Sequence, residues 1–163
     1  MEPEPRTPPL RKATPEDVGE IHSLVCDLAV YEKLRHAVTS TPADLHHAFF
    51  GHSPRAEAFV SEAPRTTTPP ISGSLAGFSI ILPTFSTFTG QAGLWLEDVY
   101  VRPELRGRGL GRAFLEHFLT LAKERGCARA EWSVLDWNTP AIEFYQHLGA
   151  HVMPDWRIAR MEL

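Results

Sequence analysis

The chain has few cysteines, no long apolar run and no excess of positive charge. Its 163 residues include two cysteines, Cys26 and Cys127, too few for a disulfide framework or a zinc cluster. No apolar run approaches the roughly 20 residues that a membrane-spanning helix needs. The net charge of −4 argues against a nucleic-acid partner and is compatible with a cationic ligand. These absences favour a globular cytoplasmic protein that neither enters a membrane nor binds nucleic acid.

The composition is that of one globular domain. Apolar residues make up 43% and charged residues 22% of the chain, as in ordinary soluble domains. A chain of this length buries roughly two thirds of its unfolded surface, which is enough for one core. Residues 1–9 are acidic and rich in proline, unlike a secretory signal, and are predicted to be a disordered tail. We therefore expect one domain over residues 10–163.

Apolar periodicity predicts alternating strands and helices in the order β-α-α-β-β-β-α-β-α-β. The helix starts combine a capping residue with proline at Thr14-Pro15, Thr41-Pro42 and Asn138-Thr139-Pro140. Another helix follows Gly111. The predicted strands are residues 10–13, 58–60, 75–82, 93–101, 130–135 and 156–161. If the strands at 93–101 and 130–135 are parallel neighbours, the helices after them begin at the same edge of the sheet, where ligands bind.

A glycine-rich segment, residues 106–112, joins a predicted strand to a predicted helix. Its glycines, at 107, 109 and 111, allow the backbone N–H groups to converge, and the helix N-terminus and arginines add positive charge. This arrangement predicts a phosphate or pyrophosphate site. The Gly-Lys-Ser/Thr ending of an ATP loop is missing, and the spacing differs from the dinucleotide fingerprint. The alternative is a tight strand-to-helix turn with solvent-facing arginines.

Five segments, in this order and spacing, resemble the GNAT superfamily of N-acetyltransferases, and within it the diamine (spermidine/spermine) and thialysine N-acetyltransferase family. They are Leu28-Ala29-Val30-Tyr31-Glu32-Lys33, Leu96-Glu97-Asp98-Val99-Tyr100-Val101, Arg106-Gly107-Arg108-Gly109-Leu110-Gly111, Trp137-Asn138 and Phe144-Tyr145-Gln146-His147-Leu148-Gly149-Ala150. The resemblance implies an α/β (α+β) fold, with a single mixed, mostly antiparallel sheet flanked by helices. It also implies direct transfer of acetyl from acetyl-CoA to a primary amine of a small molecule, by a homodimer. No metal ion is expected, for the reason given below for the histidines.

The resemblance also implies roles for individual residues. Glu97 would be the general base and Tyr145 the acid that protonates the leaving thiolate. Residues expected to contact acetyl-CoA are Val99, Tyr100, Val101, Arg106, Gly107, Arg108, Gly109, Leu110, Gly111, Arg112 and Asn138. Residues expected to contact the amine are Tyr31, Glu32 and Asp98. Judged alone, Glu97 could be an exposed strand carboxylate, Tyr145 a core aromatic and Glu32 a solvated helix-end charge.

Other functions stay open on the sequence. Lys33, Arg35 and His36 follow Glu32 where polyamine-specific relatives tend to be acidic, which weakens the case for a polyamine. The amine could instead be an amino acid, an aminoglycoside or a protein N-terminus. A catalytically silent acyl-CoA binder and a nucleotide-binding module are the further alternatives. Eight histidines are present, but His46 and His47 are adjacent and cannot face one metal from a helix. Trp95 is expected to fill core or interface.

Overall fold

The structure is a computed structural model, and it describes residues 9–64 and 71–162. The predicted tail at residues 1–9 lies outside the described residues, apart from Pro9. The chain divides into two compact units, Met1–Trp132 and Ser133–Leu163, and each is described by itself.

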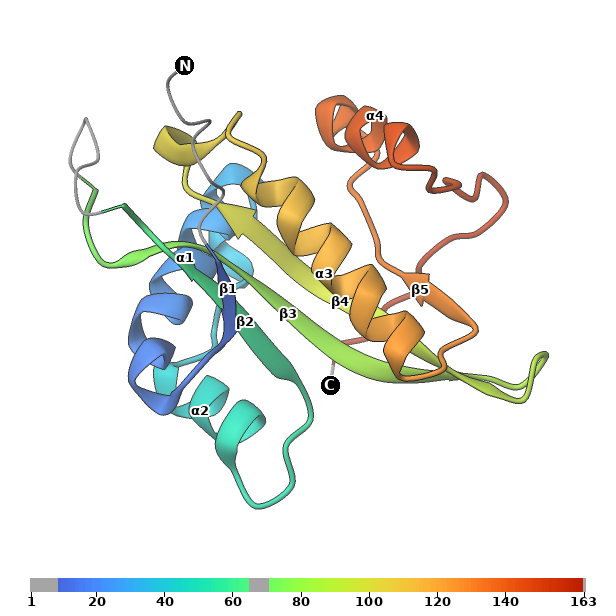
Figure 1. The fold of residues 1–163 in the computed structure, drawn as a ribbon, viewed down its shortest axis with the longest axis horizontal. Coiled ribbons are helices and arrows are strands. Elements are labelled where there is room, and N and C mark those ends of the chain that lie inside the picture. Colours follow the sequence, from blue (N-terminus) through green and yellow to red (C-terminus); the bar gives the residue numbers. More distant parts are fainter. Residues whose placement is uncertain (1–8, 65–70, 163) are drawn as a thin grey trace. The chain divides into compact units, whose positions relative to one another are not determined.

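The N-terminal unit is built on a five-stranded sheet with the strand order β1-β2-β3-β4-β5 (Figure 1). The strands are β1 (Leu10–Lys12), β2 (Glu57–Glu62), β3 (Leu75–Ser86), β4 (Gln91–Val101) and β5 (Arg129–Glu131). Neighbours from β1 to β4 are antiparallel, and β5 is parallel to β4. The expected mixed, mostly antiparallel sheet is thereby confirmed.

Helices pack on both faces of this sheet. They are α1 (Val18–Tyr31), α2 (Pro42–Phe50) and α3 (Leu110–Glu124), with short 3-10 helices at Pro15–Asp17, Arg35–Ala37 and Pro103–Leu105. Because successive strand residues point to opposite faces, β4 contributes to two cores. Tyr100 packs with the residues of α1 and α2, whereas Val101 packs with Leu110 and Phe114 of α3. Buried apolar contacts on both faces therefore hold β4 in place.

Two of the helix starts show the expected capping chemistry. At α2, the Thr41 hydroxyl accepts a hydrogen bond from the Asp44 backbone N–H, and the Asp44 carboxylate accepts one from the Thr41 N–H. This reciprocal pair satisfies two N–H groups that a helix start otherwise leaves without partners. Thr14 and Asp17 form the same box before α1.

The C-terminal unit contains one helix, α4 (Thr139–His147), among its described residues. Asn138 is its N-cap and Gly149 follows it with a φ of 89°, the left-handed conformation expected of a glycine at a helix end. The strand predicted at residues 130–135 is shorter than expected, since β5 ends at Glu131.

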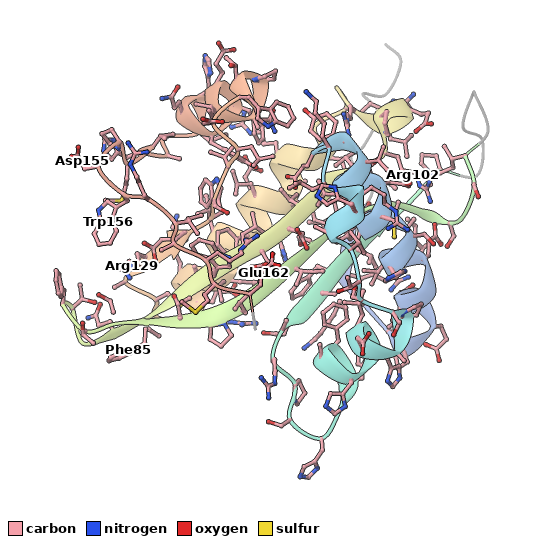
Figure 2. The ribbon with its side chains drawn as sticks, turned by 180° about the vertical axis from the view of Figure 1, so that it is seen from behind. Phe85, Arg102, Arg129, Asp155, Trp156 and Glu162 are labelled. Carbon is pink, nitrogen blue, oxygen red and sulfur yellow. The ribbon has the colours of Figure 1, made fainter. Side chains whose placement is uncertain are left out.

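The strand predicted at residues 156–161 is wrong. Described residues 150–162 form neither helix nor strand, and Trp156, Ile158 and Met161 are exposed. Figure 2 shows Trp156 on this irregular segment. The alternation of apolar residues was a sound signal for a strand, but a strand also needs a hydrogen-bonded neighbour. The described part of this unit supplies none, so the order of elements ends with α4.

Candidate active site

A β-bulge at Glu97 interrupts the pairing of β4 with β3. Leu96 pairs with Ile81 and Asp98 pairs with Ile80, so Glu97 is an extra residue without a partner on β3. A bulge bends its strand and changes the direction of the side chains beside it. The predicted general base therefore lies at the point where the ladder is locally broken.

The Glu97 carboxylate is held by a neighbour on its own strand. The indole Nε1–H of Trp95 donates to Oε2 of Glu97 over 2.8 Å. Trp95 was expected only to fill core or interface, and its contact with Glu97 was missed. The signal for it is the i, i+2 spacing, which places two side chains on the same side of a strand. Because one oxygen is engaged by the indole, the contact restrains the carboxylate and leaves Oε1 for other partners.

Three carboxylates from two elements form a cluster that we call the acidic cluster: Glu97 and Asp98 of β4 and Glu32, the C-cap of α1. Burial, with the negative charges of Glu97 and Glu32, raises the pKa of Asp98 to about 7. Burial also raises the pKa of Glu32. None of the three takes part in the ion pairs formed among the described residues. The acidic cluster therefore carries negative charge that a bound cation would neutralise.

The glycine loop ends in a helix N-terminus without a side-chain cap. Gly107 and Gly109 have φ values of 73° and 81°, which side chains other than glycine rarely adopt. Gly109 is the N-cap of α3, with no side-chain hydrogen bond and no acidic residue in the first turn. At α2, by contrast, a capping box forms hydrogen bonds with N–H groups at the start of the helix. The N–H groups of this first turn and the positive end of the helix dipole are thus available to an anion.

The arginines around this loop have different surroundings. Arg102 donates through Nη2 to Glu20 over 3.1 Å and through Nε to the Leu75 carbonyl, so it joins the end of β4 to α1 (Figure 2). Arg112 pairs with Glu116, one turn further along α3. Arg106 and Arg108 are outside the ion pairs of residues 9–64 and 71–162. These two are the loop arginines best suited to meet an anion.

Arg106 is held by contacts of another kind. Its Nε–H donates to the Val101 carbonyl over 2.9 Å. Its guanidinium carbon lies 4.9 Å from the ring centre of Tyr31 and 5.5 Å from that of Tyr100. Four expected site residues, from α1, β4 and the loop, are therefore brought into contact: Tyr31, Tyr100, Val101 and Arg106.

Strand β5 pairs with only the first half of the outer edge of β4. The strands β4 and β5 are parallel neighbours, as predicted, but pair only from Gly93 to Trp95. Past this point, the backbone N–H of Arg102 donates to the carbonyl of Ala76 in β3. Because backbone groups alternate in direction along a strand, those of Val99 and Val101 point away from β3. These groups face the edge that β5 does not cover.

The remaining expected site residues, Tyr145 and Asn138, lie in the C-terminal unit. Asn138 caps α4, and its carbonyl accepts hydrogen bonds from the N–H groups of Ala141 and Ile142. Tyr145 lies in the second turn of α4, with its ring 5.5 Å from that of Phe144.

The described residues contain neither a metal-binding cluster nor a membrane-spanning helix. Within the described part of the chain, no group of three or more His, Cys, Asp or Glu side chains could hold a metal ion. No helix in that part has both the length and the apolar content needed to cross a membrane.

Comparison with known proteins gives a consistent result. The acetyltransferase (GNAT) family model matches residues 26–150. A thialysine N-epsilon-acetyltransferase from Sus scrofa is 33% identical, over 94% of this chain and 91% of that protein. An L-ornithine N5-acetyltransferase from Arabidopsis thaliana is 30% identical, over 93% of this chain and 83% of that protein. The resemblance found in the sequence is thereby confirmed.

Solved structures agree on the fold. An integron cassette protein from the mobile metagenome of V. cholerae superposes with a TM-score of 0.73 at 18% identity, covering 96% of this chain and 93% of its own. An aminoglycoside acetyltransferase from a soil metagenomic sample gives a TM-score of 0.73 at 10% identity, covering 96% and 97%. At such low identities the likeness concerns the fold alone.

The raised pKa of Asp98 predicts that the stability of the fold falls as pH rises. Between its ordinary value of 3.8 and about 7, the unfolded chain has released this proton while the folded chain retains it, so this group destabilises the fold as pH rises. Asp98→Asn removes the penalty. We expect the variant to raise the midpoint of thermal unfolding by about 2–6 °C at pH 8, and by less at pH 5.

The matched control is Asp155→Asn, the same change at an exposed residue (Figure 2). It is expected to leave the midpoint unchanged at both pH values. An equal effect of Asp98→Asn at pH 5 and pH 8 would show that the charge of Asp98 does not oppose folding.

Proposed function

Since the chain belongs to the acetyltransferase (GNAT) family and is an acetyltransferase, we propose that it transfers acetyl from acetyl-CoA directly to a primary amine of a small molecule. One juxtaposition carries the proposal. The acidic cluster, suited to an ammonium group, and the uncapped start of α3, suited to a phosphate, both lie near the C-terminal end of β4. An enzyme that joins a cationic amine to an anionic cofactor needs both surfaces.

The residues around the glycine loop fit coenzyme A. Its pyrophosphate would bind the N–H groups of residues 107–112 with the side chains of Arg106 and Arg108. Its pantetheine arm carries amide groups, which would pair with the backbone of Val99 and Val101 along the uncovered edge of β4. Asn138 is proposed as a further contact. When bound, acetyl-CoA supplies a thioester carbonyl for attack and a thiolate that leaves.

Glu97 is proposed as the general base. An alkyl ammonium has a pKa near 10, so it must lose a proton before its nitrogen can attack. Glu97, held through one oxygen by Trp95, would accept that proton directly or through a water molecule. The new C–N bond forms as the C–S bond breaks. The N–H groups of Val99 and Val101 would stabilise the negative charge on the carbonyl oxygen, and Tyr145 would give its proton to the thiolate.

Asp98, Glu32 and Tyr31 are proposed to hold the amine. A polyamine, a diamine or a thialysine-like compound would place a positive charge against the acidic cluster. Two of the relatives are named for thialysine and L-ornithine, which are amino acids that carry an amine at the end of the side chain. These names support a small aliphatic amine as the class of substrate.

One observation favours an amino acid over a plain diamine. Lys33, Arg35 and His36 follow Glu32 directly and are exposed. The positive charge of Lys33 and Arg35 suits a substrate that carries a carboxylate beside its amine. The expected cytoplasmic location and homodimer stay predictions.

The proposed reaction is tested by measuring thiol release from acetyl-CoA with pairs of amines. Ornithine and putrescine, and lysine and cadaverine, differ only in the α-carboxylate; thialysine, spermidine and an aminoglycoside complete the panel. We expect release with at least one small amine, and a higher kcat/KM for the amino acid of each pair. Tyr145→Phe is expected to lower kcat at least about tenfold while the affinity for coenzyme A changes only a few-fold.

The outcomes separate the alternatives. Higher activity with putrescine than with ornithine would overturn the preference for amino acids. Coenzyme A binding without thiol release from any amine would favour a silent acyl-CoA binder. Unchanged turnover in Tyr145→Phe would remove Tyr145 from the role of proton donor.

The glycine loop is tested by Gly109→Val, because valine is strained at a φ of 81° and would disturb the N-terminus of α3. We expect at least a tenfold loss of coenzyme A affinity by calorimetry. The matched control is Gly126→Val at the other end of α3, where φ is 67°. It is expected to lose similar stability and keep its affinity. Equal affinities in both variants would exclude the loop as the phosphate site.

Glu97→Gln tests the general base. At neutral pH we expect at least a tenfold loss of kcat/KM, since the amide cannot accept the proton of the ammonium group. The loss should shrink as the pH approaches 10, where the amine is already deprotonated in solution. Glu104→Gln, at an exposed carboxylate, is the control. A loss in Glu97→Gln that stays the same at every pH would assign the base elsewhere.

A further inference from the structure

We propose that Tyr31 positions the cofactor loop: its ring stacks on the Arg106 guanidinium and orders that side chain for the pyrophosphate before any amine is bound. The inference rests on the proposed function, because it takes coenzyme A as the ligand of the loop. It gives Tyr31 a role different from the amine contact that the resemblance implies.

The guanidinium of Arg106 lies close to two aromatic rings. Tyr31, the last residue of α1, lies 4.9 Å from the guanidinium carbon, and Tyr100 of β4 lies 5.5 Å from it. Both distances are within the range of a cation–π contact. Tyr100 is 6% exposed and packs in the core, whereas Tyr31 is 41% exposed. Tyr31 is therefore the ring that covers Arg106 from the accessible side.

Stacking leaves the donors of Arg106 in place for an anion. A guanidinium donates its hydrogen bonds in its own plane, while aromatic rings contact its faces. One in-plane donor, Nε–H, is used by the Val101 carbonyl. The rings thus compete with none of the Nη donors, and they fix the plane in which those donors lie.

Fixing that plane matters because an arginine loses much conformational freedom when it binds a phosphate. A side chain that is already ordered loses less on binding, so the affinity of the loop rises without a new contact to the ligand. Removing the Tyr31 ring would return this freedom to Arg106 in the unliganded protein. The effect would appear in coenzyme A binding even when amine is absent.

The experiment measures the dissociation constant of coenzyme A by calorimetry without amine. Tyr31→Phe keeps the ring, and its affinity should stay within about twofold of the parent protein. Tyr31→Leu removes the ring, and we expect affinity to fall about threefold to fivefold. Phe88→Leu is the control, because it removes a ring that is 98% exposed, between β3 and β4. Unchanged affinity in Tyr31→Leu would overturn the proposal.

A double-mutant cycle with Arg106→Gln tests whether Tyr31 acts through Arg106. If it does, Tyr31→Leu costs threefold to fivefold in the parent protein and close to nothing in Arg106→Gln. Equal losses in both backgrounds would mean that Tyr31 acts independently of Arg106, which contradicts the proposal. If the parent protein does not bind coenzyme A, the proposed function itself fails, so the two failures are distinguishable.

Discussion

The site depends on one irregularity in one strand, the extra residue in β4 at Glu97. A regular antiparallel pair would continue the alternation of side chains and keep every residue of β4 opposite a partner on β3. The bulge interrupts this pattern between Leu96 and Asp98, at the acidic cluster. It persists because Tyr100 and Val101, on opposite faces of the sheet, are anchored in two apolar cores. Tight packing beyond the bulge is thus what allows a local break in the ladder.

Charge is distributed unevenly about the end of β4. Near the end of α1, Asp98 and Glu32 are partly buried and have no ion-pair partner among the described residues. This burial raises the pKa of each carboxyl group. On the side of α3, the helix begins without a cap. Elsewhere the same chain caps α2 with Thr41 and Asp44 and pairs a half-buried glutamate, Glu20, with Arg102. Unpaired groups of this kind cost stability, and they are most readily explained by ligands of the opposite charge.

The sequence predicted the structural features that depend on neighbouring residues or on a repeated spacing. Thr41-Pro42, the glycines before α3 and the apolar periodicity placed helices and strands correctly, because capping, left-handed turns and amphipathic faces are properties of neighbouring residues. It did not predict the bulge, since register depends on two strands at once. It missed the contacts of Trp95 and Arg106 for a related reason: nothing local specifies which partner a long side chain meets. The strand expected at residues 156–161 failed because an apolar alternation cannot supply a neighbouring strand.

The stacking of Tyr31 on Arg106 has a consequence for how two ligands of opposite charge share this region. Tyr31 and Glu32 are adjacent in the chain, so the residue that orders the loop arginine precedes a carboxylate of the acidic cluster. A bound cation that moves the end of α1 would change the contact between Tyr31 and Arg106. A bound anion that moves Arg106 would in turn change the position of the end of α1. Thermodynamic linkage then requires that each ligand changes the affinity of the other by the same factor.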